Sequence, residues 1–254
     1  MTTAPYVALV EVFRSVQGEG FHAGRPAIFV RLAGCPLACE FAPGVVCDTP
    51  YQVAKSWATV DELFGEIIPS LGGLETDSVR RKRQDVRAVP MLILTGGEPT
   101  VNPQFDALAD RANKCGFYTA VETNGTVWRE GLRRLDWISV SPKDAVPQTS
   151  KAQWHNAHPR GLKLLARVRL EVATRKAGAE YRYVIGGRSV PAPPYYAASR
   201  HYVSPAVRSD GSGEEWKTGF PGFAVGALER CLEIVQADPR WRISTQQHKL
   251  WCVR

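Results

Sequence analysis

Three cysteines lie close together in the first fifth of the chain, at Cys35, Cys39 and Cys47, directly after an apolar segment of strand length. Thiolates are soft ligands, so this group could hold an iron–sulfur cluster or a zinc ion. A structural zinc ion normally takes four protein ligands, whereas a cubane cluster held by three cysteines leaves one iron open for a small molecule. The spacing alone leaves three interpretations open: a cluster, a zinc ion with a distant fourth ligand, and a chance grouping of buried thiols.

Polar loops follow three further apolar segments. They are residues 95–99 (Thr-Gly-Gly-Glu-Pro), 122–125 (Glu-Thr-Asn-Gly) and 141–143 (Ser-Pro-Lys). In α/β proteins, the loops that follow parallel strands meet at the carboxyl edge of the sheet. We therefore expect these loops to gather at one site.

Hydrophobic patterns predict the elements that must position these loops. Strands are expected at residues 7–13, 26–32, 90–94, 117–121, 137–140, 181–185, 201–203 and 241–244. A capping box of Thr59 and Glu62 predicts a helix that Pro69 ends. Further helices are expected from about residue 103 to 115 and over 223–236.

The remaining segments are turns and loops. A glycine-rich turn is expected at 17–20, between the first two strands, and 72–88 is polar and basic, as in a surface loop. Residues 144–179 give no clear pattern. The alternation of strand, polar loop and helix predicts an α/β barrel or open α/β sheet, in one domain without a linker.

Composition sets the class of protein. The chain has 254 residues, of which 44% are hydrophobic and 22% charged, as in ordinary globular proteins. It lacks an apolar run long enough to span a membrane and a signal-like N-terminus, so we expect a cytoplasmic protein. Its net charge is +7, and the run 80–83 with Arg87 favours a solvated loop over nucleic-acid binding. Six cysteines are too few for a disulfide scaffold.

Taken in order, the motifs resemble the radical S-adenosylmethionine (SAM) superfamily, and within it the 7-carboxy-7-deazaguanine synthases of queuosine and 7-deazapurine biosynthesis. The resemblance covers nearly the whole chain. The matching segments are 18–20, 24–27, 29–35, 47–49, 95–99, 122–125, 140–143, 180–182 and 244–249. It implies a partial (β/α) barrel of the radical SAM type, as a single domain over 1–254, with a cluster loop at 33–50 and a tail at 244–254 that closes over the substrate.

Two positions depart from the family pattern. Seven residues separate Cys39 from Cys47, five more than the family usually has. Pro43 and Gly44 can turn the chain, so the longer loop still allows the thiols to meet on one cluster. Ser204 stands before a proline where the family tends to carry glutamine in a strand that contacts SAM.

The resemblance implies a lyase with a 4Fe-4S cluster, SAM and Mg²⁺ as cofactors. Its substrate would be 6-carboxytetrahydropterin, which loses a hydrogen atom to the 5′-deoxyadenosyl radical, contracts its ring and releases ammonia to give 7-carboxy-7-deazaguanine. SAM is regenerated. A small flavodoxin or ferredoxin is the expected electron donor, a homodimer is possible, and neither a membrane nor a nucleic acid is an expected partner.

The resemblance also assigns site residues, none of them with a certain catalytic role. Cys35, Cys39 and Cys47 would hold the cluster, and Thr49 would bind Mg²⁺. Cofactor contacts are expected from Val46, Asp48, Gly96, Gly97, Glu98, Thr123, Asn124, Ser141, Pro142, Lys143 and Ser204. Substrate contacts are expected from Val16, Gln17, Gly18, Glu19, Arg31, Thr95, His248 and Arg254.

Physical reasons support several of these assignments. Glycine at 96 and 97 would let the backbone approach the methionyl part of SAM, and Glu98 could pair with its ammonium. Arg31 can bind a carboxylate through two hydrogen bonds. Thr123 and Asn124 could instead simply form a turn.

Two other functions stay open. Another radical SAM enzyme, such as an activase of glycyl-radical proteins, would share the cysteine loop and the Gly-Gly-Glu-Pro motif. A zinc- or cluster-binding interaction protein could use the basic loop to bind RNA. Activity on the pterin would separate the first from a synthase, and a colourless zinc protein that does not cleave SAM would support the second.

Overall fold

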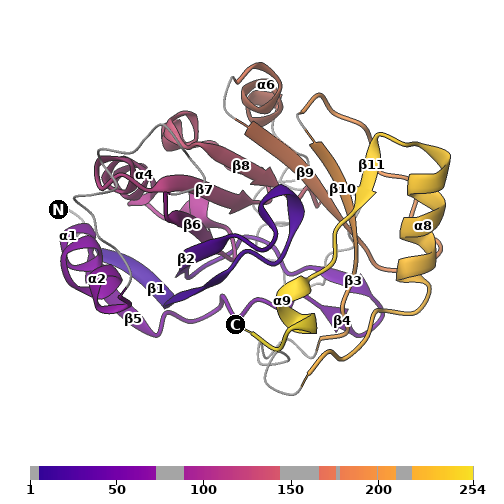
Figure 1. The fold of residues 1–254 in the computed structure, drawn as a ribbon, viewed down its shortest axis with the longest axis horizontal. Coiled ribbons are helices and arrows are strands. Elements are labelled where there is room, and N and C mark those ends of the chain that lie inside the picture. Colours follow the sequence, from indigo (N-terminus) through magenta and orange to yellow (C-terminus); the bar gives the residue numbers. More distant parts are fainter. Residues whose placement is uncertain are drawn as a thin grey trace.

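A computed structural model describes residues 6–72, 89–143, 166–175, 178–198, 200–209 and 219–253. It contains a nine-stranded sheet in the order β11-β10-β9-β8-β7-β6-β2-β1-β5 (Figure 1). The strands are β1 (Tyr6–Val16), β2 (Pro26–Leu32), β5 (Ser56–Thr59), β6 (Met91–Gly96), β7 (Tyr118–Thr123), β8 (Trp137–Val140), β9 (Gly178–Ile185), β10 (Arg200–Pro205) and β11 (Trp241–Ile243).

The sheet is parallel except at β1. From β2 through β6 to β11, each strand pairs in parallel with its neighbour, whereas β1 is antiparallel to both β2 and β5. Its edge strands, β5 and β11, are not paired with each other, so the described sheet is open. This confirms the expected α/β partial barrel. All eight predicted strands are present, and β5 is an addition to them.

The helices follow the predictions with small shifts. The capping box is present, because Thr59 N donates to Glu62 Oε2 at 2.6 Å and Glu62 N donates to Thr59 Oγ1 at 3.1 Å. The helix that it opens runs through α1 (Val60–Glu62), a wide π turn (Leu63–Ile67) and α2 (Ile68–Ser70). The prediction that Pro69 ends it was wrong by one residue: proline is tolerated in the first turn of a helical segment, and α2 starts at Ile68.

The later helices are α4 (Phe105–Lys114), α6 (Ala166–Thr174), α8 (Ala227–Ala237) and α9 (Gln247–Leu250). Short 3-10 turns lie at η1 (Gly20–His22), η3 (Pro99–Val101) and η4 (Glu130–Arg134). Helix α8 starts four residues later than predicted, because Gly226 just before it has a positive φ of 73°. Helix α6 was not predicted. Most of the expected surface loop at 72–88, with its basic run, lies outside the described residues.

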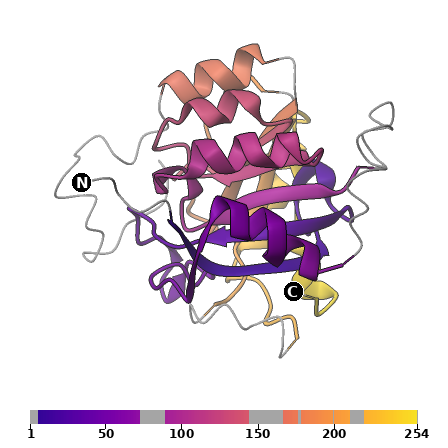
Figure 2. The same cartoon turned by 90° about the vertical axis from the view of Figure 1, so that its left-hand side faces the viewer.

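Alternation along the strands separates the core from the site. Leu92 and Leu94 of β6 pack in the main core, which also receives residues of α4, α6 and α8. Met91 and Ile93 point to the other face of the sheet and form a smaller inner cluster. Helices α4 and α6 stack on the outer face (Figure 2). The inner face at the carboxyl ends of the strands is thereby left for a ligand.

No helix in the described parts of the chain has the length and apolar character that crossing a membrane requires.

Candidate functional site

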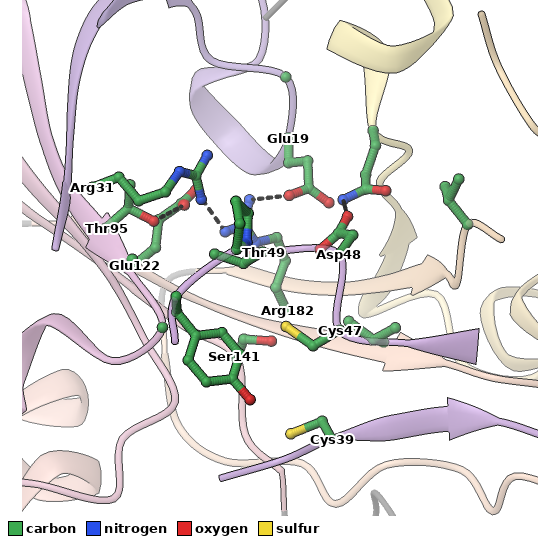
Figure 3. A pocket seen from close by; sticks show the side chains of 18 of the residues that line it. Glu19, Arg31, Cys39, Cys47, Asp48, Thr49, Thr95, Glu122, Ser141 and Arg182 are labelled. Atoms are coloured by element: carbon green, nitrogen blue, oxygen red, sulfur yellow. Dashed lines mark hydrogen bonds and ion pairs between the residues drawn. The ribbon is translucent and has the colours of Figure 1, made fainter. Parts of the chain in front are cut away.

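A cavity of about 260 Å³ opens at the carboxyl ends of the parallel strands (Figure 3). Most of the residues predicted from the sequence line it. They are Val16, Gln17, Gly18, Glu19, Arg31, Cys35, Cys39, Val46, Cys47, Asp48, Thr49, Thr95, Gly96, Gly97, Thr123, Asn124, Ser141, Lys143, Ser204 and His248. Glu98 and Pro142 do not line it, and Arg254 lies outside the described residues.

The long cysteine loop folds into a small hairpin. Strands β3 (Glu40–Ala42) and β4 (Val45–Val46) pair antiparallel, and Gly44 makes the turn with a φ of 75°. At the base of the hairpin, Cys47 N donates to Cys39 O at 3.0 Å. The extra residues therefore bulge away while the two cysteines stay side by side, as the Pro43–Gly44 turn predicted.

The three thiols share the cavity, and none of them forms a disulfide. Burial is the main cause that raises the pKa of Cys47 to about 11 and the pKa of Cys35 still further. Buried thiols of this kind lose their protons readily only to a bound metal.

Two metal groups could be held by these thiols: a single zinc ion or a cubane cluster. Among the described residues, no three His, Cys, Asp or Glu side chains converge closely enough for a single metal ion. In a cubane, each cysteine binds a different iron, so the sulfur atoms stay apart around a larger group. Three thiolates are the donor set of a cubane cluster with one open iron, whereas a structural zinc ion normally takes four ligands.

The Gly-Gly-Glu-Pro loop packs against the cysteine loop. A Cβ on Gly96 would lie 2.2 Å from the backbone oxygen of Leu32, and one on Gly97 would lie 2.5 Å from Cys35 Cβ. Glu98 N donates to Gly34 O at 3.0 Å. These glycines are thus required by the close approach of two loops, independently of any ligand.

Glu98 is fully buried behind the cavity wall. It accepts hydrogen bonds from Thr100 Oγ1 at 2.6 Å, from Thr123 Oγ1 at 2.8 Å and from Asn124 N at 2.6 Å. Burial raises its pKa above the ordinary value despite these donors. Glu98 therefore holds the 123–124 turn, and its side chain does not line the cavity, so its contact with the ammonium of SAM stays a prediction.

The next two loops present polar groups whose partners are local. Asn124 Oδ1 accepts from Thr126 N at 2.9 Å, which supports the turn role that the sequence left open. Lys143 Nζ donates to Ser141 Oγ at 2.6 Å and lies 5.3 Å from the ring centroid of Phe41. Ser204 Oγ donates to the backbone oxygen of Ser244 at 2.7 Å.

The glycine-rich turn between β1 and β2 is anchored on the opposite side of the cavity. Glu180 accepts from Phe21 N at 2.9 Å, and Gly20 N donates to Ser244 Oγ at 2.9 Å. The Phe21 ring stacks on Trp137 with centroids 5.2 Å apart. These contacts fix the turn that carries Gln17 and Glu19 into the cavity.

The C-terminal tail contains α9, drawn in yellow near the C-terminus in Figure 1, and Gln246, His248 and Lys249 of this tail line the cavity. Gln247 N donates to Gly18 O at 3.0 Å, and a Cβ on Gly18 would lie 2.0 Å from His248 Nδ1. On the other side, Lys249 Nζ donates to Asp48 Oδ2 at 2.8 Å. The tail thus joins the glycine-rich turn to the cysteine loop and places His248 in the cavity wall.

The apolar residues of the tail do not make this closure. Leu250, Trp251 and Val253 are all exposed. The side chains that reach back are polar ones, Gln246, His248 and Lys249.

Comparison with known proteins identifies the relatives of this chain. A 7-carboxy-7-deazaguanine synthase of Bacteroides thetaiotaomicron is 29% identical over 96% of this chain and 97% of its own length. Enzymes of the same name from Haemophilus influenzae and Neisseria meningitidis are 33% and 36% identical, but the chain spans only 54% of each. The crystal structure of QueE from Escherichia coli has the same fold, with a TM-score of 0.59 and 21% identity over 96% of this chain and 95% of that chain. No family model matches the sequence.

The chain is a homologue of the 7-carboxy-7-deazaguanine synthases. The resemblance expected from the sequence is thereby confirmed, and so is the fold class. The roles of individual residues in this homologue remain predictions that the geometry of the cavity can support or weaken.

Two residues of this synthase homologue were missed as site residues although both lie in motifs that the sequence singled out. Glu122 and Arg182 line the cavity, and Arg182 Nη2 donates to Glu122 Oε1 at 2.9 Å. The available signal was a charged residue within a strand, because Glu122 lies near the carboxyl end of β7 and Arg182 lies in the middle of β9.

Arg31 lies on the same inner face and already forms an ion pair. Its Nε donates to Glu11 Oε1 at 2.8 Å, and both side chains are mostly buried. Burial lowers the pKa of Arg31, and the negative charges of Glu122 and Asp48 partly offset this effect. Arg31 thus adds a positive charge, beside that of Arg182, to a cavity wall that also carries Glu19 and Glu122.

Proposed function

We propose that this protein is a 7-carboxy-7-deazaguanine synthase, a radical SAM lyase that converts 6-carboxytetrahydropterin to 7-carboxy-7-deazaguanine with loss of ammonia. One observation carries the proposal: a single cavity contains both the three cysteine thiols and the polar groups suited to a pterin. The full-length similarity to a synthase supports it.

Cys35, Cys39 and Cys47 would hold a 4Fe-4S cluster on the cysteine-loop side of the cavity. When bound, the cluster and SAM supply the radical that removes a hydrogen atom from the substrate. Lys143 and Ser141 line the cavity near the hairpin and would bind the polar parts of SAM.

The pterin would bind toward the glycine-rich turn. Glu19 and Glu122 are carboxylates that can accept hydrogen bonds from the amino-pyrimidinone edge of the ring. Arg31 would attract the substrate carboxylate, and His248 would contact the ring from the tail. This arrangement puts the ring between the turn and the tail, facing the cluster side.

Magnesium is part of the same proposal. Thr49 lines the cavity next to Asp48, and a hydroxyl can contribute to a Mg²⁺ ion that keeps waters and takes substrate oxygens. We also propose a cytoplasmic location, a flavodoxin or ferredoxin as electron donor, and a homodimer, on the similarity to the synthases alone.

Anaerobic reconstitution tests the proposal. The protein is loaded with iron and sulfide and incubated with SAM, reductant and 6-carboxytetrahydropterin, and products are identified by mass spectrometry. Formation of 7-carboxy-7-deazaguanine supports the proposal. A protein that binds a cluster and cleaves SAM without converting the pterin would be a different radical SAM enzyme, and a zinc-loaded protein inert toward SAM would reject the class.

A further inference from the structure

Arg182 lies at the centre of the polar wall of the cavity, on β9, with only 7% of its side chain exposed. Its Nη1 donates to Glu19 Oε2 at 3.2 Å, and its Nη2 donates to Glu122 Oε1 at 2.9 Å. Its Nε lies 3.9 Å from Glu180 Oε1. One guanidinium therefore bridges carboxylates from the glycine-rich turn and β7 (Figure 3), and it lies near a third carboxylate on its own strand.

The same contacts set the direction of Gln17. Its Nε2 donates to Glu122 Oε1 at 3.1 Å, and its Oε1 accepts from Glu19 N at 3.1 Å. Thr95 Oγ1 donates to the second oxygen of Glu122 at 2.9 Å. Since a carboxylate can accept about four hydrogen bonds, Glu122 retains room for one more donor beyond these three. Glu19 and Glu122 both line the cavity, so that donor can come from a ligand.

We propose that Arg182 is a positioning residue that holds Glu19 and Glu122 as two fixed acceptors, and thereby selects a ligand ring with adjacent N–H donors. The inference rests on the proposed function, since the amino-pyrimidinone edge of a pterin is such a ring. Without the guanidinium, two carboxylates on one buried wall repel each other and favour taking up a proton.

The electrostatics follow from the groups that face Glu122. Burial alone would raise the pKa of this carboxyl, but Arg182, together with the hydrogen bonds from Gln17 and Thr95, more than offsets burial and holds it at about 2. Without Arg182, burial and the neighbouring carboxylates favour the protonated form, so the pKa would rise. The other charged or titratable groups facing Glu122 come from β2, the glycine-rich turn, β9 and α9: Arg31, Glu19, Glu180 and His248.

Substitution of Arg182 tests the proposal in the cluster-loaded protein. In Arg182→Met we expect pterin affinity to fall by about tenfold to a hundredfold, as for loss of hydrogen bonds to charged groups. The loss should grow as the pH falls below neutrality, because Glu122 then takes up a proton. SAM affinity should be unchanged. Arg182→Lys keeps the positive charge but loses the planar guanidinium that donates to two carboxylates at once. It should recover part of the pterin affinity, and that affinity should not depend on pH.

A double variant separates positioning from folding. Arg182→Met with Glu122→Gln removes the group that titrates, so the acid-side loss should disappear while the affinity stays low. Arg240→Met is the matched control, since Arg240 is an exposed arginine that pairs with Asp238, and it should behave as wild type.

The outcomes distinguish the two proposals. Wild-type pterin affinity and a flat pH profile in Arg182→Met would overturn the inference, and if that variant does not fold, wild-type pterin affinity in both Arg182→Lys and Glu122→Gln would do so. If wild type binds no pterin, the proposed function fails instead. The inference is then decided by thermal unfolding between about pH 5.5 and about pH 8: because a raised pKa of Glu122 lets the folded state bind the proton more readily than the unfolded chain, a gain of stability toward acid in Arg182→Met that is absent from the double variant supports it, and equal slopes overturn it.

Discussion

Lys249 Nζ lies 2.8 Å from Asp48 Oδ2, and the Lys249 side chain is almost fully buried. Gln246 Nε2 donates to the same oxygen at 3.1 Å. Asp48 stands between Cys47, expected to bind the cluster, and Thr49, expected to bind magnesium. The C-terminal tail is therefore tied directly to the loop that carries both.

Breaking this pair should loosen the tail. In Lys249→Met we expect faster hydrogen exchange over residues 247–253 and pterin affinity lower by about tenfold, because Asp48 is left buried without its cation. Hydrogen–deuterium exchange and ligand titration measure the two effects. Unchanged exchange would show that backbone contacts alone hold the tail.

Gly18 offers a sharper test of the tail. Gly18→Ala places a Cβ 2.0 Å from His248 Nδ1, so His248 must move and pterin affinity should fall, with SAM affinity unchanged. Gly65→Ala is the matched control, since its Cβ would meet nothing within 4 Å. If both variants bind the pterin like wild type, His248 does not form part of the substrate site.

The cluster ligands can be separated from the other thiols. Cys35→Ala, Cys39→Ala and Cys47→Ala should each abolish the brown cluster, whereas Cys115→Ala should keep about four irons per chain. Iron analysis and electron paramagnetic resonance of the reduced protein measure this. A normal cluster in Cys47→Ala would mean that Cys47 is not a cluster ligand and that another thiol binds in its place.

Thr49→Ala should lose most of the stimulation by magnesium while still binding SAM, because it lacks the hydroxyl expected to bind the ion. Thr49→Ser keeps that hydroxyl and should respond like wild type. Turnover measured against magnesium concentration checks the prediction. Equal stimulation of all three proteins would remove Thr49 from the ion site.

His22 predicts a pH dependence of stability away from the cysteine loop. Burial, with Arg25 and Arg200 nearby, lowers its pKa from 6.5 to about 4. The unfolded chain therefore binds a proton more readily than the folded one, so stability falls as the pH drops from about 6.5 toward about 4. His22→Gln should remove most of this loss between pH 7 and pH 5. Equal slopes for wild type and variant in thermal unfolding would contradict it.

The strands could be predicted because their apolar residues alternate or run continuously between clear breaks. The elements that escaped are short or weakly patterned: β5 has four residues, and α6 buries only Val168 and Val172. The hairpin within the cysteine loop was foreseen only as a bulge at Pro43 and Gly44. Local patterns do not reveal pairing over so few residues.

The sequence indicated which residues line the cavity better than it indicated which residues they contact. Gly96 and Gly97 lie in the cavity wall, yet their close neighbours are Leu32 and Cys35, which no local pattern could indicate. Glu98 was expected in the cavity because it is polar and follows a strand. The hydrogen bonds that hold it behind the wall come from residues up to 26 positions away.

The central claim is that one cavity performs radical chemistry on a pterin while regenerating SAM. It is tested most directly by turnover with a small, known amount of SAM and an excess of 6-carboxytetrahydropterin and reductant. If SAM were consumed, each molecule of SAM would give at most one molecule of product. The amount of product is therefore measured by mass spectrometry and compared with the amount of SAM added. The account predicts more 7-carboxy-7-deazaguanine than SAM added, and none in Cys47→Ala. A fully loaded protein that consumes SAM without forming this product would contradict it.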